Sequence, residues 1–235
     1  RSAADGKEDK MRAGEGYRPP EALSRTEALF LYLTDKEGYC IYNSVWSKLF
    51  LASMVRDMRF PVGRNSEDIT YTTRALCRIK RAVYLDEPLY DYVKAREGSI
   101  MNDVSGKRML EDEIPFWKEH IGIIRACGEE TEGAEREELL RLAKIATYQY
   151  YKRILSYDVR LFRLKSNRTY AKRLEAMLYD EKEKIRSIYE EAYVTKGDAA
   201  RMRLFLLSPA LYRGSEKIYG GVLLPFRRRM IKAGQ

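Results

Sequence analysis

A pair of adjacent carboxylates, Glu67 and Asp68, stands between a turn-forming stretch at residues 63–66 and an amphipathic stretch that follows it. A carboxylate so placed can accept the proton of a hydroxyl group while the hydroxyl oxygen forms a new bond. The amino-terminal end of a helix would favour the charged form of Asp68, which weakens it as a base but keeps it deprotonated. Acidic residues are also common in the first turn of helices for capping alone, so ordinary capping is the alternative interpretation.

Aromatic and cationic side chains flank this pair along the chain. Lys48 and Arg96 could hold phosphate groups through charge-assisted hydrogen bonds, or could form structural ion pairs with the two carboxylates instead. Trp46 could form an apolar wall against a sugar ring, and a place in the hydrophobic core is the equal alternative. The single histidine, His120, lies within a helical pattern and is interpreted as a surface or packing residue.

The chain of 235 residues is long enough for one large domain or two small ones, and its formal net charge is +9. Such a charge is common in proteins that bind nucleic acid, anionic lipid or phosphorylated ligands. No helix-turn-helix, ribonucleoprotein or zinc-finger pattern accompanies it, so nucleic acid is not predicted as a partner. No apolar run reaches the roughly 20 residues that a membrane-spanning helix needs.

Three cysteines, Cys40, Cys77 and Cys127, are far apart in the sequence and form no paired metal-binding spacing. Together with the shortage of histidine, this spacing argues against a structural zinc or iron site in this chain. Buried free thiols in a reducing cytoplasm are therefore expected.

The first part of the chain predicts short elements of mixed type. A capping-box pattern at residues 24–27 predicts a helix that starts there. Residues 40–60 fit either a short helix with a strand or two strands. Asn65 or Ser66 is expected to cap a helix that runs to about residue 79. Two strand-like stretches, residues 81–85 and 89–93, surround a turn signal.

Long helical patterns begin near residue 107. Apolar residues at helical spacing predict three helices, over residues 109–127, 135–157 and 167–193. Thr195 and Asp198 are expected to cap a fourth helix, which Pro209 ends. The predicted fold class is therefore α+β and predominantly α-helical.

Three stretches then occur in a fixed order. The first is Trp46-Ser47-Lys48-Leu49-Phe50. The second runs from Arg59-Phe60-Pro61 to Glu67-Asp68, and the third joins Leu89-Tyr90-Asp91-Tyr92 to Arg96-Glu97-Gly98-Ser99-Ile100. In this order the chain resembles the acceptor-side, carboxyl-terminal half of bacterial family-2 glycosyltransferases of the GT-A fold. The resemblance extends over roughly residues 24–215.

The resemblance implies an inverting transfer of a sugar from a nucleotide-sugar donor to a glycan or lipid-linked acceptor. It assigns the catalytic base to Asp68, with Glu67 beside it, and substrate contacts to Trp46, Lys48, Arg96 and Ser99. A divalent metal, Mg²⁺ or Mn²⁺, is expected in the complete enzyme, where a D-x-D element of the nucleotide-binding half would hold it. This sequence contains no such element, so we expect no metal in this chain and no activity from it alone.

The implied organisation has four parts. A flexible lead-in covers residues 1–23, a strand-containing acceptor-side part covers 24–105, a helical region covers 106–215 and a basic tail covers 216–235. The expected location is cytoplasmic, and the tail could touch the inner face of a membrane or be a disordered basic end; its cations are Arg227, Arg228, Arg229 and Lys232. The alternative function is a non-enzymatic, basic helical module that binds a partner protein or a membrane surface, and the oligomeric state stays open.

Overall fold

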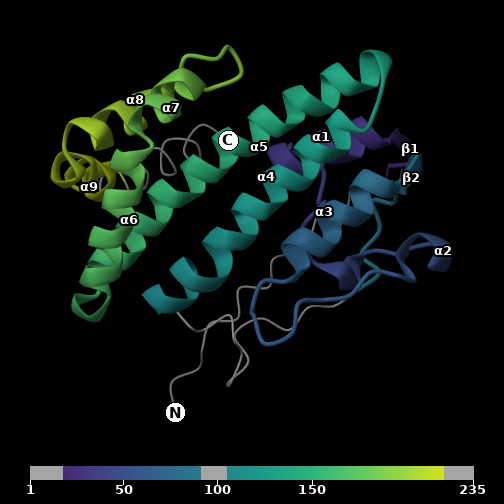
Figure 1. Cartoon of the computed structure of the whole chain (residues 1–235), viewed down its shortest axis with the longest axis horizontal. Helices are drawn as coiled ribbons and strands as arrows, with labels where there is room; N and C mark the ends of the chain where they lie inside the picture. Colours follow the sequence, from purple (N-terminus) through teal and green to yellow (C-terminus); the bar gives the residue numbers. More distant parts are fainter. Residues whose placement is uncertain (1–17, 91–104, 220–235) are drawn as a thin grey trace, which may run out of the picture.

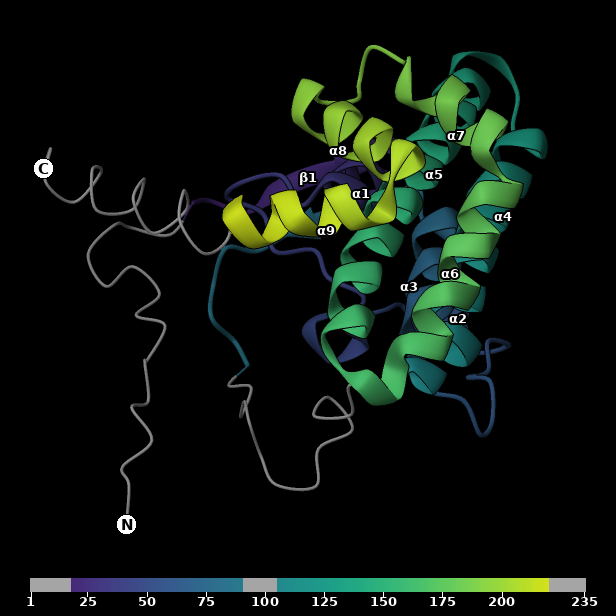
Figure 2. The same ribbon diagram turned by 90° about the vertical axis from the view of Figure 1, so that its left-hand side faces the viewer.

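The longest helix, α5 (Gly133–Arg163), runs through the middle of the computed structural model, which describes residues 18–90 and 105–219 (Figure 1). It lies beside α4 (Ile114–Glu129), which continues a short π-helical segment, Arg108–Glu113. These two helices form a middle layer. The carboxyl-terminal helices cover one side of it, and the amino-terminal elements cover the other (Figure 2).

The amino-terminal layer contains a small antiparallel sheet of two strands, β1 (Glu21–Ser24) and β2 (Arg81–Tyr84). Glu21 pairs with Tyr84 and Ser24 pairs with Arg81, so the strands bring the two ends of this layer together. The layer's helices follow in chain order: α1 (Arg25–Thr34), a 3-10 turn (Val45–Ser47), α2 (Ala52–Val55) and α3 (Asp68–Arg78).

The carboxyl-terminal layer is entirely helical within the described residues. Its elements are α6 (Arg168–Asp180), preceded by a 3-10 turn at Lys165–Asn167, then α7 (Lys182–Tyr189), α8 (Lys196–Leu207) and α9 (Pro209–Ile218). Together with the other layers they give a predominantly helical architecture with one small sheet, which confirms the coarse fold prediction.

Two hydrophobic clusters meet along α5. The first half of that helix buries Leu139 and Leu142 against α1 and α3, whereas its second half buries Tyr151 and Ile154 against α6 to α9. Removing one such side chain from water stabilises the fold by about 1.5–3 kcal/mol. Because one rigid helix serves both clusters, it fixes the amino-terminal layer relative to the carboxyl-terminal one.

Several local predictions are confirmed. Ser24 and Glu27 form the complete capping box at the start of α1. Thr195 accepts a hydrogen bond from the backbone N–H of Asp198 and so caps α8, which ends at Leu207. The helices predicted over residues 109–127 and 135–157 are present as α4 and α5, and residues 81–84 form a strand.

Other predictions are wrong. Residues 21–23 lie in β1 and not in a flexible lead-in, because Leu23 is buried and the strand finds its partner in β2. The helix predicted over 167–193 is broken at Glu181, whose carboxylate accepts hydrogen bonds from Tyr151 of α5 (2.6 Å) and Lys118 of α4 (3.2 Å). Pro209 ends α8 as expected but also begins α9, since proline suits the first turn of a helix.

Parts of the predicted elements lie outside the described residues. Leu89 and Tyr90 are not in a strand, and residues 91–93 are not described. Within the stretch at 40–60 the structure has the 3-10 turn and α2, and no strand. Residues 216–218 of the predicted tail belong to α9, whereas the cations at 227, 228, 229 and 232 lie beyond the described part. None of the helices that the structure describes is long and apolar enough to cross a bilayer.

Candidate functional site

The start of α3 carries the predicted catalytic pair, and its position is fixed by the opposite face of the helix. Ile69, Thr72 and Thr73 are buried there, as their helical spacing predicts. The Thr73 hydroxyl lies 2.6 Å from Nδ1 of His120 on α4, and a second hydroxyl, that of Thr72, donates to the backbone carbonyl of Asn43. The first turn of α3 is therefore held between α4 and the loop that precedes it.

That loop is anchored at Asn43. Its side-chain oxygen accepts a 2.7 Å hydrogen bond from the Tyr32 hydroxyl of α1. Lys48 closes the following turn, since its Nζ donates to the backbone carbonyls of Tyr42 (2.6 Å) and Ser44 (2.7 Å) and to Oγ of Ser47 (3.3 Å). An ammonium group has three N–H donors, so the loop itself occupies all of them.

Asp68 is half-buried in the first turn of α3. Burial raises its pKa, and the neighbouring charge of Glu67 raises it further, whereas backbone hydrogen bonds and Lys48 act in the opposite direction. The sequence argument considered only the helix amino terminus, which favours the charged form; backbone hydrogen bonds there do lower the pKa of Asp68, but desolvation is the larger effect and the net shift is upward. No side chain in the described part of the chain is hydrogen-bonded to Asp68 or ion-paired with it.

Lys48 acts electrostatically on Asp68, and its positive charge lowers the pKa of that carboxyl. Burial lowers the pKa of Lys48 to about 8, and the negative charge of Asp68 counteracts that shift. The two groups therefore influence each other without forming an ion pair. A carboxylate that is partly desolvated beside one constrained cation is better prepared to take up a proton than an ordinary surface aspartate.

The cap of α3 differs from the prediction. Glu67 itself is the N-cap residue, with helical backbone angles and no side-chain cap hydrogen bond. Asn65 instead donates to Oδ2 of Asp112 (3.1 Å), and Ser66 has a left-handed backbone with a φ of 69°. Neither Asn65 nor Ser66 is therefore the N-cap residue, because both belong to the strained turn before the helix.

Trp46 lies in the same loop as Lys48 and is not a core residue, since 44% of it is exposed. Its ring stacks on Tyr90 with 4.4 Å between the ring centroids. Exposed apolar side chains, Leu49 and Val62, follow Trp46 and Lys48 along the chain. Arg96 and Ser99, the remaining predicted substrate contacts, lie outside the described residues. The structure thus brings Glu67, Asp68 and Lys48 together.

The residues that anchor the loop were missed by the sequence argument. Tyr32, Asn43 and Thr72 join α1, the loop and α3 into one unit, yet nothing in their spacing marks them as partners. The only available signal was that Thr72 falls on the buried face of α3, where a hydroxyl needs a hydrogen-bond acceptor. His120 proves to be a packing residue, and burial lowers its pKa to about 3, so it stays neutral.

Two pockets are described, and neither is lined by the predicted site residues. One lies between the ends of α3 and α4, and the other between α4, α5 and α7. In the described ranges 18–90 and 105–219, no group of three or more metal-binding side chains could hold a metal ion. The residues present do not fit the divalent metal that the resemblance implies for the complete enzyme, and we assign no step to it.

Comparison of the chain with protein-family models, with curated proteins and with solved structures gave no match.

Proposed function

We propose that this chain supplies the acceptor side of an inverting glycosyltransferase of the GT-A type, in which Asp68 is the base that deprotonates the acceptor hydroxyl. The observation that carries the proposal is the state of this carboxylate. It is half-buried, unpaired among the described side chains and has a raised pKa, at the position where the sequence motif locates the base. Carboxylates that serve only to cap a helix are usually solvated or hydrogen-bonded.

The proposed reaction needs only one proton transfer from this part of the enzyme. The acceptor oxygen attacks the anomeric carbon of the donor sugar, the bond from that carbon to the nucleoside diphosphate breaks, and the hydroxyl proton passes to Asp68. A raised pKa increases the driving force for that transfer. Glu67 contributes because its adjacent charge raises the pKa of Asp68.

The neighbouring loop has two parts in this proposal. The stacked rings of Trp46 and Tyr90 provide an apolar wall, which suits the face of a sugar. The hydrogen bonds of Lys48 favour a structural role over phosphate binding. In that role Lys48 orders the loop and keeps a positive charge near Asp68. The donor contacts, including the metal, belong in this proposal to a separate nucleotide-binding half.

The protein encoded by the complete gene should be assayed with nucleotide sugars and a set of glycan acceptors. Asp68→Asn should lower the rate of transfer by about 10²–10⁴-fold, the usual contribution of a general base. Asp57→Asn is the matched control, because Asp57 lies in the preceding loop and pairs with Arg78 at the surface, so it should leave the rate unchanged. Unchanged turnover of the Asp68→Asn variant would refute the assignment.

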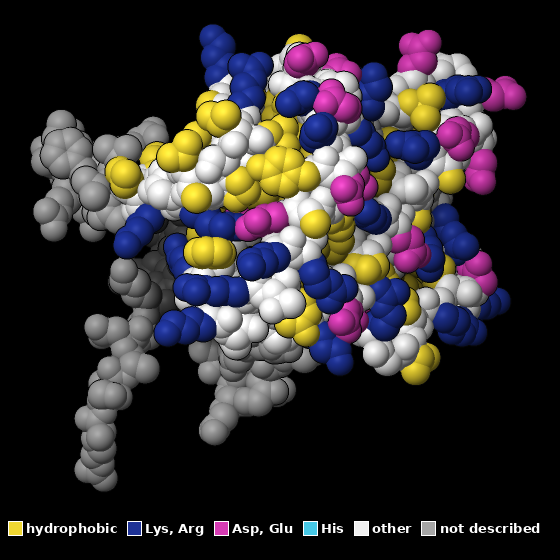
Figure 3. Space-filling view, turned by 60° about the vertical axis from the view of Figure 1, so that its left-hand side comes forward, with side chains coloured by type: hydrophobic (Ala, Val, Ile, Leu, Met, Phe, Trp, Pro, Cys, Tyr) yellow, Lys and Arg dark blue, Asp and Glu magenta, His cyan; other side chains and the backbone are white. Residues whose placement is uncertain are grey.

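A binding module without catalysis is the second candidate, and the exposed apolar face of α9 favours it. Leu211 and Ile218 of α9, and Leu207 at the end of α8, are at least half exposed. Figure 3 shows hydrophobic and basic side chains next to each other on one face of the molecule. Such a face suits a partner protein or an anionic membrane surface. The same assay separates the candidates, because a binding module would show no transfer that Asp68→Asn could lower.

A further inference from the structure

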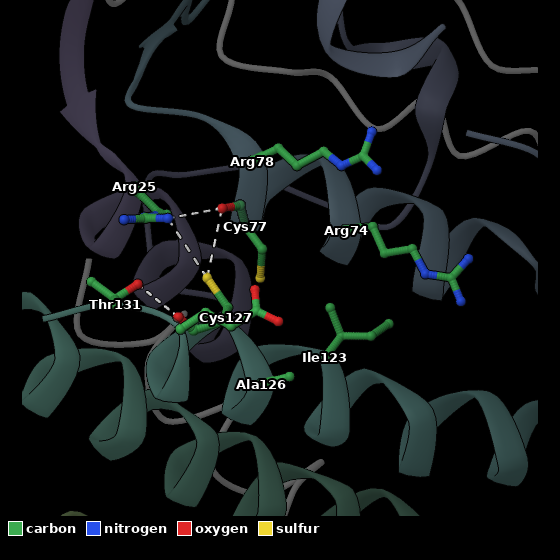
Figure 4. Close-up of a pocket in the computed structure, with 9 residues that line it drawn as sticks. Arg25, Arg74, Cys77, Arg78, Ile123, Ala126, Cys127 and Thr131 are labelled. Atoms are coloured by element: carbon green, nitrogen blue, oxygen red, sulfur yellow. Dashed lines mark hydrogen bonds between the residues drawn. The ribbon is translucent and has the colours of Figure 1, made fainter. Parts of the chain in front are cut away.

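A pocket of about 370 Å³ lies at the end of α3 opposite to Asp68 (Figure 4). Two cysteines from different helices line it, Cys77 in the last turn of α3 and Cys127 near the end of α4. Both thiols are free, and both residues are about nine-tenths buried. The sequence argument expected three buried free thiols, which is wrong for the exposed Cys40, and tertiary packing brings the other two cysteines together.

Arg25, the first residue of α1, points at this pair. Its Nη1 donates to the backbone carbonyl of Cys77 (3.0 Å) and to Sγ of Cys127 (3.7 Å). Sγ of Cys127 also lies 3.6 Å from the carbonyl oxygen of Cys77. The guanidinium and the two cysteines therefore meet at one side of the pocket, as the dashed contacts in Figure 4 show.

A salt bridge with Glu135 holds the guanidinium of Arg25 in that orientation. Nε and Nη2 of Arg25 bind the two carboxylate oxygens of Glu135 at 2.9 and 2.8 Å, which leaves Nη1 directed at the sulfur. The other two arginines of the pocket are engaged elsewhere, Arg74 with Glu119 and Arg78 with Asp57. In Figure 4 their side chains extend away from the cysteines. Only Arg25 supplies a positive charge to the thiol pair.

We propose that Cys127 is a peroxide-reactive thiol and that Cys77 is its resolving partner, so that oxidation closes an intrachain disulfide between α3 and α4. A cysteine near an arginine, in a pocket with access from solvent and beside a second thiol, has the surroundings of redox-active cysteines. The proposal is independent of the glycosyltransferase assignment.

The chemistry balances with hydrogen peroxide as the oxidant. The Cys127 thiolate attacks one peroxide oxygen, the sulfur–oxygen bond forms, the oxygen–oxygen bond breaks, and the departing hydroxide takes up a proton to become water. Cys77 then attacks the sulfenic sulfur, the disulfide bond forms, and the hydroxyl leaves as a second water with the proton of Cys77. Two thiols are oxidised to one disulfide and one peroxide is reduced to two waters.

The protonation of the pair agrees with these roles. The neighbouring Cys77 thiol, together with Arg25, lowers the pKa of Cys127 to about 7, although burial and the charge of Glu135 oppose this shift. The pKa of Cys77 is raised, first by its interaction with Cys127 and then by burial. Oxidation of Cys127 removes the negative charge beside Cys77, so the resolving thiol then becomes easier to deprotonate.

The test uses the full chain with Cys40→Ser, which removes the only exposed cysteine of the described residues. Hydrogen peroxide should convert this variant to a product that has lost two hydrogen atoms, and peptide mapping should join the peptides of Cys77 and Cys127. With Cys77→Ser the reaction should stop at a sulfenic acid on Cys127 that dimedone traps. With Cys127→Ser, Cys77 should stay reduced.

Two further variants break the same ion pair with opposite consequences. Arg25→Gln removes the positive charge and should slow the alkylation of Cys127 by iodoacetamide at pH 7 about fivefold, which corresponds to a pKa rise of about one unit from about 7. Glu135→Gln keeps the positive charge of Arg25 and one oxygen acceptor for its N–H groups, and it removes an opposing negative charge, so it should keep or increase that rate.

The titratable groups that face Cys127 are Arg25 of α1, Cys77 of α3, Glu130 at the end of α4 and Glu135 of α5.

Arg78→Gln is the matched control, since Arg78 lines the same pocket but binds Asp57, and the rate should not change. A purely structural role of the ion pair would move the Arg25→Gln and Glu135→Gln rates in the same direction, which would overturn the proposal. A disulfide that forms only in the unfolded chain, or a Cys127 that reacts no faster than Cys77 in the folded protein, would overturn it as well.

Discussion

The starts of α3 and α8 each place an aspartate within the first helical turn, but the two carboxylates have opposite surroundings. Asp198 accepts hydrogen bonds from the hydroxyls of Tyr148 and Thr195 and an ion pair from Lys152 (3.0 Å). Burial alone would raise the pKa of Asp198, but these donors outweigh it and the pKa is lowered. Asp68 has no such donors among the described side chains, and its pKa is raised.

The difference teaches that the amino-terminal end of a helix does not by itself decide how a carboxylate behaves. The helix dipole stabilises the charged carboxylate at both sites, and this stabilisation is worth about 0.3–1 kcal/mol. What differs is the neighbouring element, because α5 presents Tyr148 and Lys152 to Asp198, whereas Lys48 near Asp68 donates to the carbonyls of its own loop. A carboxylate that its fold leaves unpaired is free to act on a ligand.

Alanine substitution tests this contrast with the largest expected effect. Asp198→Ala should lower the free energy of unfolding by about 3 kcal/mol, because it removes the acceptor from a buried charged network. Asp68→Ala should change that free energy by less than about 1 kcal/mol, since a lost dipole interaction is offset by a relieved desolvation. Urea unfolding at pH 7 measures both, and equal losses would contradict the comparison.

Two tyrosines of α5 provide a smaller and more closely matched test. Tyr148→Phe removes a hydroxyl that donates to Asp198 and should cost about 1.5 kcal/mol of unfolding free energy. Tyr150→Phe removes a buried hydroxyl without a hydrogen-bond partner among the described residues, so it should be neutral or stabilising by up to about 1 kcal/mol. Thermal or urea unfolding of both variants would show whether the hydrogen-bond acceptor of the hydroxyl or the burial of the ring determines the change in unfolding free energy.

The pH dependence of stability gives the finest distinction. The raised pKa of Asp68 means that its contribution to stability is fully present below its unfolded pKa of about 4 and is lost as the pH rises through its folded pKa. Asp68→Asn should therefore become more stable than the wild type, by up to about 1 kcal/mol, as the pH increases above about 4.

Asp198 should behave in the reverse way, because its pKa is lowered. The contribution of Asp198 to stability is present above the pKa of about 4 that it has in the unfolded chain, and it disappears as the pH falls through its pKa in the folded protein. The instability of Asp198→Asn relative to the wild type should therefore fade below about pH 4. Urea unfolding across this range, with the two asparagine variants side by side, checks both signs, and parallel curves would contradict the assignment.

Local signals in the sequence were sufficient for most of the helices. The capping box at Ser24, the cap at Thr195 and the apolar face of α3 all depend on residues within one or two turns, and all three are present in the structure. The strand β1 and the break at Glu181 were missed because they depend on β2, Tyr151 and Lys118, which are distant in the chain.

The candidate site was predicted as a set of residues but not as an arrangement. The motif order singled out Glu67, Asp68 and Lys48, and the structure brings these three together. The sequence did not reveal that the ammonium group of Lys48 donates its hydrogen bonds to backbone carbonyls of its own loop. The pairing of Cys77 with Cys127 was equally hidden, because fifty residues separate them along the chain.

The sequence by itself determined the helical periods, the caps and the presence of a carboxylate pair after a turn, since each follows from neighbours that the backbone holds together. Only the tertiary structure decided which charged groups are satisfied. Desolvation and partner geometry depend on the packing of α3, α5 and α8 against other elements, and these effects exceed the helix dipole that local sequence supplies.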